Sequence, residues 1–297
     1  MVDYRSVFRP GQFAGQTVLV TGAGSGIGRC TAHELRSLGA RVALVGRTPE
    51  KLEAVRAEMG GGKDVFTHAC DLRQDGAVKE MVGEVLNWSG RIDGLVNNAG
   101  GQFPSRLRDL STNGWNAVIA NNMTATFLVS REVFLQWMEA NGGAIVSVGA
   151  DWPLGMPGMG HNGAARAGQH NFTLTASVEW AASGVRLNQV IPGFIASSGF
   201  DRYPEGAHDV LRKAAGRVPL KRHGTESEIS AAIVFLLSEA AAYITGAFIR
   251  VDGGMHNYNK ASFYEVPEHK NSKPYIGFPL YRTPKVLQEP PNPESGD

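Results

Sequence analysis

Short apolar segments alternate with longer helical patterns along most of the chain. Apolar runs of strand length, flanked by Gly, Asn or Asp, occupy residues 17–21, 41–46, 65–69, 94–97, 144–148, 185–191 and 247–251. Runs that are apolar throughout are typical of parallel strands that are buried on both faces. Helical patterns lie between them, for example at residues 49–59, 75–88, 112–139, 164–182 and 226–237. The alternation predicts a doubly wound α/β fold, with seven parallel strands and helices on both faces of the sheet.

The alternation continues without a break to Gly254 and then stops. The residues that follow are rich in proline and show no sustained period. We therefore expect one dinucleotide-binding domain at residues 1–255 and an extended or partly disordered arm at residues 256–297.

The first strand runs directly into the glycine-rich turn Gly22-Ala-Gly-Ser-Gly-Ile-Gly28, and a helix follows from about Ile27. Gly22 permits a tight turn, Gly26 lets the backbone approach phosphate oxygens, and Gly28 allows the helix to pack on the strand. The free N–H groups at the start of the helix then point at the anion. This arrangement predicts binding of NAD or NADP.

The end of the second strand bears on the choice of cofactor. An acidic residue there would bind the ribose 2′-hydroxyl of NAD, but the chain has Gly46 followed by Arg47. An arginine can pair with a 2′-phosphate. NADP(H) is therefore favoured, and NAD(H) stays possible.

Three motifs in order give the chain a resemblance to the short-chain dehydrogenase/reductase family from residue 15 to residue 254. They are the glycine turn, Asn97-Asn-Ala-Gly100 after the fourth strand, and Pro192-Gly193 after the sixth. The resemblance implies that Asp71 holds the adenine side, that residues 98–100 line the cofactor, and that Ile195 reaches the nicotinamide amide. The expected cofactor-binding residues are Gly22, Ser25, Gly26, Ile27, Gly28, Arg47, Asp71, Leu72, Asn98, Ala99, Gly100, Arg166, Pro192, Gly193 and Ile195.

The catalytic positions depart from the family pattern. Ala150 stands at the position of the family's Ser, and Asn162 and Arg166 stand at the positions of its Tyr-x-x-x-Lys. Asn122 matches the active-site Asn of the family. Positions 162 and 166 are one helical turn apart and face the same way. Asn162 cannot act as a general acid and Arg166 does not deprotonate, so ordinary alcohol and ketone interconversion lacks its proton carrier.

Hydride addition to an enoyl or dienoyl thioester needs less from the protein, because hydrogen-bond donors can stabilise the enolate that forms. Asn122 and Arg166 are the expected donors. Four segments are similar to peroxisomal trans-2-enoyl-CoA and 2,4-dienoyl-CoA reductases: residues 100–103, 161–168, 178–180 and, for the former, 264–269. The enoyl reductases have been assigned a Tyr and Lys later on the same helix, where this chain has His170 and Leu174. The Tyr that dienoyl reductases draw from an earlier loop is Trp152 here.

Asp151, His161 and His170 are the candidates left for proton handling. His161 precedes the expected active-site helix and can titrate near neutrality. His170 is expected to face a packed neighbour. An alternative activity is a hydroxyacyl-CoA or carbonyl dehydrogenase that uses His161 or Asp151 through a water. An alternative of another class is a catalytically silent cofactor-binding subunit that stabilises an active paralogue.

Composition limits the partners. Lys and Arg number 29 against 28 Asp and Glu, and no basic stripe suggests nucleic acid or an anionic membrane. No tight His and carboxylate cluster predicts a metal site. Two cysteines, Cys30 and Cys70, and a start without a signal pattern favour the cytoplasm. We expect small-molecule partners, above all an acyl-CoA.

The helix expected at residues 112–139 carries Phe127, Phe134, Trp137 and Met138, an apolar face too broad for one core contact. In the family this helix and the next form a dimer interface, so the resemblance implies a homodimer or homotetramer. A lid over the substrate opening is expected from residues 204–217 together with the proline-rich tail.

Overall fold

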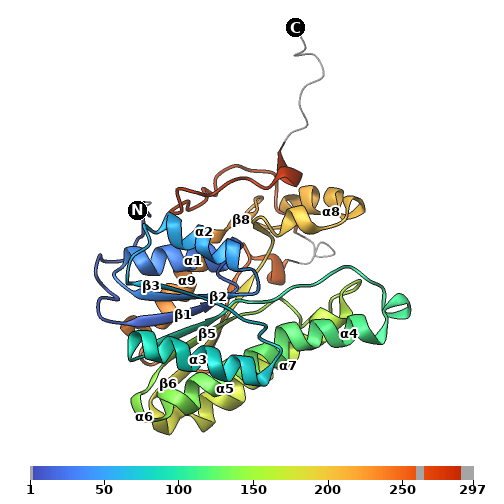
Figure 1. Ribbon diagram of the computed structural model, residues 1–297. Helices are drawn as coiled ribbons and strands as arrows, with labels where there is room; N and C mark the ends of the chain where they lie inside the picture. Colours follow the sequence, from blue (N-terminus) through green and yellow to red (C-terminus); the bar gives the residue numbers. More distant parts are fainter. Residues whose placement is uncertain (1–2, 259–263, 289–297) are drawn as a thin grey trace.

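A computed structural model describes residues 3–258 and 264–288 of the 297-residue chain. Its main feature is a seven-stranded parallel sheet in the order β3-β2-β1-β4-β5-β6-β9 (Figure 1). The strands are β1 Thr17–Thr21, β2 Arg41–Gly46, β3 Val65–Ala69, β4 Gly94–Asn97, β5 Gly143–Val148, β6 Val185–Pro192 and β9 Phe248–Val251. A separate pair joins β7 (Ile195–Ala196) to β8 (Gly224–Thr225). The expected doubly wound fold is confirmed, and each expected strand bound agrees to within one residue.

The helices form a layer on each face of the sheet. They are α1 Gly26–Ser37, α2 Pro49–Glu58, α3 Asp75–Ser89, α4 Thr112–Ile119, α5 Ala125–Val133, α6 Glu139–Asn141, α7 Gly160–Glu179, α8 His208–Lys213 and α9 Glu226–Leu237. Helices α1, α2 and α9 cover one face, and α3, α5 and α7 cover the other (Figure 1). None of the described helices combines the length and hydropathy that crossing a membrane requires.

Residues of a single strand face both layers in turn. In β1, Val18 and Val20 pack with the α1 and α9 layer, whereas Leu19 packs with the α3 and α5 layer. All three are almost completely buried. Burying such a side chain contributes about 1.5–3 kcal/mol, so a strand that is apolar throughout is stabilised by both layers. This explains why uninterrupted apolar runs located the strands.

Two helix predictions need correction. Helix α7 begins at Gly160, earlier than expected, because Gly160 and Gly163 lower helix propensity without preventing the helix. The helix expected at 112–139 contains two π-helical segments, Ala120–Thr124 and Phe134–Met138. Each π segment widens one turn and changes which face the following residues present.

The apolar face expected for a dimer is consequently divided. Phe134 and Met138 are buried in the core, and Phe134 stacks on Trp180 with ring centroids 4.3 Å apart. Phe127 keeps 39% of its surface exposed. Phe134 and Met138 therefore stabilise the monomer and are not free to form an interface.

The tail is extended and packs on the helix layer of α1 and α9. Phe278 is 1% exposed and lies under the guanidinium of Arg29, whose Cζ is 5.0 Å from the ring centroid. The Ser227 hydroxyl accepts hydrogen bonds of 3.1 Å from the N–H groups of Gly277 and Phe278. Residues 264–288, called the arm below, are thus attached to the fold (Figure 1).

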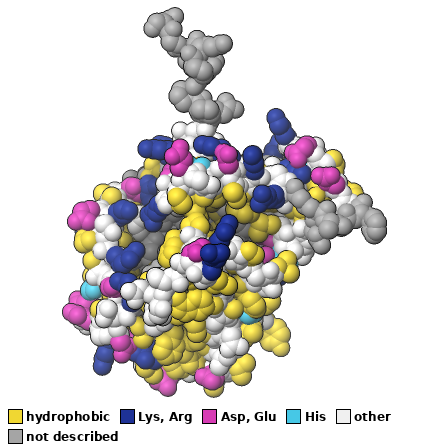
Figure 2. Space-filling view, turned by 90° about the vertical axis from the view of Figure 1, so that its right-hand side faces the viewer, with side chains coloured by type: hydrophobic (Ala, Val, Ile, Leu, Met, Phe, Trp, Pro, Cys, Tyr) yellow, Lys and Arg dark blue, Asp and Glu magenta, His cyan; other side chains and the backbone are white. Residues whose placement is uncertain are grey.

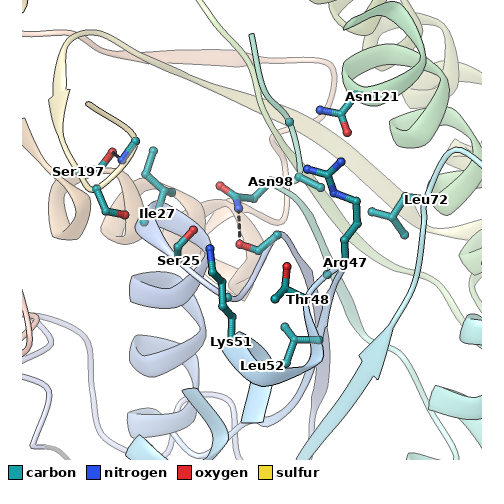
Figure 3. Close-up of a pocket in the computed structure, with 18 of the residues that line it drawn as sticks. Ser25, Ile27, Arg47, Thr48, Lys51, Leu52, Leu72, Asn98, Asn121 and Ser197 are labelled. Atoms are coloured by element: carbon teal, nitrogen blue, oxygen red, sulfur yellow. Dashed lines mark hydrogen bonds between the residues drawn. The ribbon is translucent and has the colours of Figure 1, made fainter. Parts of the chain in front are cut away.

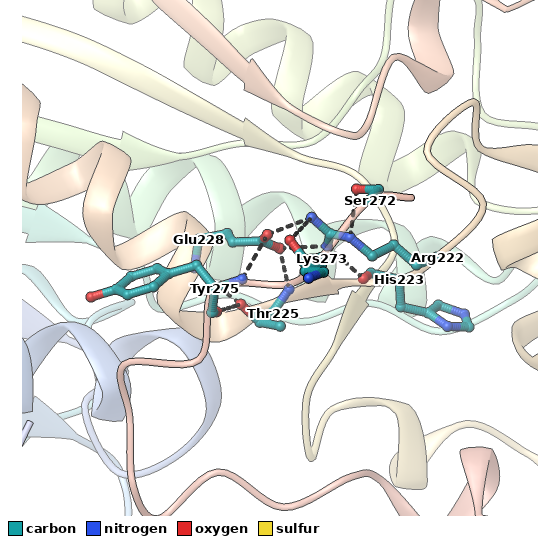
Figure 4. Close-up of polar contacts among 7 residues, drawn as sticks. All are labelled: Arg222, His223, Thr225, Glu228, Ser272, Lys273 and Tyr275. Carbon is teal, nitrogen blue, oxygen red and sulfur yellow. Dashed lines mark hydrogen bonds and ion pairs between the residues drawn. The ribbon is translucent and has the colours of Figure 1, made fainter. Parts of the chain in front are cut away.

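A polar network fixes the first half of the arm (Figure 4). Arg222 pairs with Glu228 at 2.6 Å and donates to the hydroxyl of Ser272 at 3.0 Å. Glu228 also completes a capping box with Thr225 at the start of α9. The hydroxyl of Thr225 donates to the carbonyl oxygen of Tyr275 at 2.6 Å. The same residues therefore cap α9 and hold the arm.

Candidate functional site

A pocket of about 290 Å³ opens at the carboxyl edge of the sheet, where the strand order reverses between β1 and β4 (Figure 3). Ligands of open α/β sheets bind at this kind of edge. The pocket is lined by residues 22, 24–27, 46–48, 51, 52, 70–72, 98–100, 121, 197–199 and 202.

The floor of the pocket is the glycine turn between β1 and α1. Gly22 has φ +64°, which favours glycine, and a Cβ at Gly28 would lie 2.5 Å from the carbonyl oxygen of Gly22. The side-chain amide of Asn98 donates to the carbonyl oxygens of Thr21 (3.0 Å) and Gly22 (3.3 Å), which ties the turn to the end of β4. Ser25 is the N-cap residue of α1, and its side chain makes no capping bond. The first N–H groups of α1 are therefore available to an anion.

Positive charge dominates the pocket lining. Arg47, Lys51 and Arg202 are the cations, and the one carboxylate among the lining residues is Asp71. Asp71 is already bound to Arg73, with 2.6 Å between Oδ2 and Nη2, and this bond lowers the pKa of Asp71 to about 2. Figure 3 shows Arg47 and Lys51 reaching into the pocket from the end of β2 and from α2. An anionic ligand suits this lining.

Most of the residues expected to bind a cofactor lie together. The pocket lining includes Gly22, Ser25, Gly26, Ile27, Arg47, Asp71, Leu72, Asn98, Ala99 and Gly100. Gly28 lies beneath the turn, within α1. Arg166, Pro192, Gly193 and Ile195 are not among the lining residues. Ile195 instead faces a neighbouring cavity of about 510 Å³ that Val218 and Arg250 also line.

Several lining residues were missed from the sequence. Lys51 lies in the first turn of α2, and Arg47 lies before the helix, so no helical spacing relates the two residues. Asn121 adjoins the expected Asn122. Ser197 and Arg202 come from the segment after β7, and nothing in the local sequence of that segment indicated contact with the glycine turn.

Arg166 is a buried cation at the carboxyl end of β5. Its side chain is on α7, its residue is 7% exposed, and its Nη1 donates to the carbonyl oxygen of Val148 (2.7 Å) and to Oε1 of Gln169 (3.0 Å). Nη2 lies against Gly100, since a Cβ there would be 2.7 Å from it. Burial lowers the pKa of Arg166 to about 10, so the guanidinium stays charged at neutral pH. Among the described residues its Nε has no hydrogen-bond partner.

Asn162 lies in the first turn of α7 and is fully buried. Its amide nitrogen is 3.7 Å from the sulfur of Met156, and its oxygen has no hydrogen-bond partner among the described residues. An amide in this place supplies no proton, as expected from the sequence.

Asn122 is buried inside the first π segment and is fully engaged by backbone. Its amide hydrogens go to the carbonyl oxygens of Gly101 and Val118, both at 2.8 Å, and its oxygen accepts from the N–H of Gly101 at 3.1 Å. The expected role as a direct donor to an oxyanion does not fit this arrangement, because both hydrogens are taken. Asn122 instead holds the loop that follows β4 in place.

His161 is the second residue of α7, whereas the sequence suggested that it precedes the helix. The ring is fully buried and lies edge-on to Phe103, with centroids 4.7 Å apart. Burial lowers its pKa from the usual value, which favours the neutral imidazole. His170 packs against Phe248 and lies 3.1 Å from the side-chain oxygen of Gln189, as expected of a residue with a packed neighbour.

Asp151 belongs to a charged cluster that the sequence did not reveal. Its carboxylate lies 2.9 Å from Nδ1 of His256 and 3.5 Å from Nε of Arg250. Arg250 is on β9 and His256 lies just after it, so both are far from Asp151 in sequence. No three His, Cys, Asp or Glu side chains in the described part of the chain are grouped to hold a metal ion.

Comparison with known proteins identifies the family of this chain. Residues 22–256 match the family model described as enoyl-(acyl carrier protein) reductase. The chain belongs to the short-chain dehydrogenase/reductase family. Members of this family bind NAD(P)(H), and the glycine turn, the uncapped start of α1 and the cationic lining fit the pyrophosphate of such a cofactor.

Relatives within the short-chain dehydrogenases differ in substrate. A peroxisomal 2,4-dienoyl-CoA reductase of Danio rerio is 34% identical over 86% of this chain and 86% of its own length. A glucose 1-dehydrogenase of Gluconobacter oxydans is 36% identical over 83% of this chain and 94% of its own. The solved structure of a citronellol catabolism dehydrogenase (AtuB) of Pseudomonas aeruginosa is 54% identical, with a TM-score of 0.76, over 85% of this chain and 99% of that one. The family is thus an oxidoreductase family, and the substrate has to be argued from the site.

Proposed function

We propose that the protein is an NADP(H)-dependent reductase of an unsaturated acyl-CoA. The observation that carries the proposal is the buried guanidinium of Arg166 at the carboxyl end of β5, in a site where Ala150 and Asn162 supply no acid. Such a site can stabilise a negative oxygen but cannot hand a proton to a carbonyl oxygen. The similarity to a dienoyl-CoA reductase supports the same substrate class.

The chemistry follows from this limit. The chemistry that bound NADPH would supply is a hydride for the β-carbon of an enoyl thioester. The electron pair of the double bond moves onto the thioester oxygen, and the α-carbon then takes a proton from water. Arg166 contributes a fixed positive charge for that oxygen in a site of low dielectric, where it is worth more than in water. Asn122 contributes by holding Gly101.

A preference for NADP(H) rests on the end of β2. Arg47 and Lys51 line the pocket beside Thr48, while the neighbouring carboxylate Asp71 is bound to Arg73. A 2′-phosphate would meet two cations and a hydroxyl there. A ribose 2′-hydroxyl would find no carboxylate free to accept its hydrogen bond.

Self-association is part of the proposal. Exposed apolar side chains lie on the helices of one face, and they include Trp115, Phe127, Leu174 and Val178. Figure 2 views the α4 and α7 side and shows hydrophobic side chains gathered below its centre. A contiguous apolar surface of this kind marks an interface, and a homodimer or homotetramer would cover it.

The test of the function is NADPH oxidation by the purified protein with crotonyl-CoA, trans-2-decenoyl-CoA and 2,4-decadienoyl-CoA. Thermal-shift titrations with NADPH and NADH run beside it. Turnover of any of these thioesters, with tighter binding of NADPH than of NADH, is the expected result. The cofactor could raise the melting temperature while the protein turns over none of these thioesters and none of a panel of ketones and alcohols. That result would contradict the proposed reductase activity and favour a catalytically silent subunit.

One observation favours a second candidate, an alcohol or carbonyl dehydrogenase. The 54% identical relative is named for citronellol catabolism. An alcohol oxidation needs a base for the hydroxyl proton, and the Asp151 and His256 pair is a group at this edge of the sheet that can accept one. NADP⁺ reduction with citronellol, compared with NADPH oxidation by the thioesters, separates the two candidates.

A further inference from the structure

The segment that follows β7 reaches across the mouth of the cofactor pocket. Residues 197–217, called the lid below, contain three short 3-10 helices and α8. Nη2 of Arg202 donates to the hydroxyl of Ser25 at 3.3 Å, although the two residues are far apart in the chain. Ser25 is the N-cap of α1. The lid therefore touches the glycine turn directly through the side chain of Arg202.

Arg202 is an exposed cation that makes no ion pair with the described residues. Within the part of the chain that the structure describes, its hydrogen-bond partner is Ser25, and no carboxylate forms an ion pair with it. It also lines a second cavity of about 420 Å³, which adjoins the pocket and is lined by the cations Lys51 and Arg282 and by the carboxylates Glu58 and Glu226. A neutral hydroxyl is a weak partner for a guanidinium, which binds phosphate in a bidentate way.

The residues on either side of Arg202 hold it in this position. Asp201 accepts a hydrogen bond of 3.1 Å from the N–H of Val286, in the arm. The phenol oxygen of Tyr203 accepts a hydrogen bond of 2.8 Å from the side chain of Gln102, in the loop after β4. The lid backbone at position 202 is thus tied to the arm on one side and to the active-site loop on the other.

The arm strengthens the first of these ties. Nε of Arg212, at the end of α8, donates to the carbonyl oxygen of Val286 at 2.8 Å. Val286 is buried between Phe200 and Leu211 of the lid. Both backbone groups of Val286 are therefore bound by the lid. A backbone held in this way loses less entropy on binding than a free one.

We propose that Arg202 binds the pyrophosphate of the dinucleotide from the lid, in exchange for its bond to Ser25. The inference rests on the cofactor site of the proposed function and adds a positioning residue to it. The pyrophosphate lies between the start of α1 and Arg202, so bound cofactor fixes the lid against the glycine turn.

The experiment compares the Kd values of R202A and R217A for two probes by calorimetry. Arg217 is an exposed lid arginine and serves as the matched control. NADPH contains the pyrophosphate, whereas 2′-AMP contains only the adenosine and 2′-phosphate. We expect R202A to raise the Kd for NADPH about tenfold or more, as loss of a charged hydrogen bond predicts. The Kd for 2′-AMP should stay unchanged, and R217A should change neither.

A second readout follows the lid itself. Lys213 is an exposed residue of α8, and trypsin can cleave the chain after it. Saturating NADPH should slow this cleavage in the wild type. In R202A, saturating NADPH should leave the cleavage rate unchanged. Equal NADPH affinity and equal protection in R202A and R217A would overturn the inference. An equal loss of both probes in R202A would also overturn it, because the effect would not depend on the pyrophosphate. Failure of the wild type to bind NADPH or NADH would instead contradict the proposed function.

Discussion

The guanidinium of Arg166 donates a hydrogen bond of 2.7 Å to the carbonyl oxygen of Val148, the last residue of β5. This bond fixes a buried positive charge at the carboxyl edge of the sheet. The neighbouring Gln169 accepts a second bond from the same nitrogen, at 3.0 Å. The charge is therefore held in one orientation, which is what electrostatic stabilisation of a transition state requires.

Replacement of Arg166 by Met removes the charge and keeps most of the volume. We expect kcat for an enoyl-CoA to fall about 100-fold or more, because loss of one oxyanion donor costs about 3 kcal/mol. R166K keeps a positive charge and restores the Lys that the family has at this position, so it should retain part of the activity. Steady-state kinetics with NADPH, beside thermal unfolding of each variant, measure this. Turnover of R166M close to the wild-type value would show that the oxyanion is stabilised elsewhere.

Asn122 should contribute to the stability of the fold more than to direct binding of the substrate oxygen. N122A removes three hydrogen bonds to backbone groups, two to Gly101, which is exposed, and one to the buried carbonyl oxygen of Val118. We expect the free energy of unfolding to fall by about 1–3 kcal/mol, since one buried group loses its partner. N121A is the matched control, because Asn121 is the next residue and lines the pocket; a change within about 0.5 kcal/mol is expected there. Equal urea midpoints for the two variants would refute this role.

The sheet was predictable because its signals are local. Each strand is a short apolar run whose residues pack on both layers, as in Val18 and Leu19, so no distant information was needed. The glycine turn was equally local, because its required conformations are properties of Gly22 and Gly28 themselves. Residues of these two kinds were placed correctly from the sequence alone.

The chemistry of the site depended on contacts between distant segments. The position of Asn122 was predicted, but the sequence could not show that Gly101 would occupy its amide. His161 had the right residue type, yet its burial against Phe103 lowers its pKa and favours the neutral ring, which the sequence could not show. The bonds of Arg202 to Ser25 and of Asp151 to His256 join segments that no local pattern relates.

Glu226 should make stability depend on pH. It is buried at the start of α9, and this burial raises its pKa from the usual 4.5 to about 7, although Arg29 opposes the shift. Between these values the folded chain binds more protons than the unfolded chain, so stability falls as pH rises. E226Q removes this loss. We expect the free energy of unfolding of E226Q to be up to about 3 kcal/mol higher than that of the wild type at pH 8, and only slightly higher at pH 5.

Urea unfolding of both proteins without cofactor, at pH 5 and pH 8, measures the difference. Glu34 is also buried with a raised pKa, but it is present in both proteins and cancels. A stability difference between E226Q and wild type that is the same at both pH values would mean that Glu226 does not titrate in this range.

Phe278 anchors the arm and should contribute strongly to stability. The ring is buried against Tyr4 and His33, with centroids 6.0 Å and 4.9 Å away. F278A leaves a cavity and should cost about 3–5 kcal/mol, as is typical for buried phenylalanine. I276A is the control, because Ile276 lies two residues away and is 42% exposed. Similar urea midpoints for the two variants would mean that the arm adds little to the fold.

The exposed apolar face offers the last prediction, which concerns assembly. Val178 lies near the end of α7 and is 75% exposed, and Leu174 lies one turn before it. A charge in the middle of such a face cannot be desolvated cheaply, so V178E should shift a dimer or tetramer towards the monomer. V210E is the control, because Val210 is 47% exposed on α8, away from α7. Sedimentation velocity at micromolar concentration measures the change. A wild-type protein that sediments as a monomer would contradict the proposed self-association.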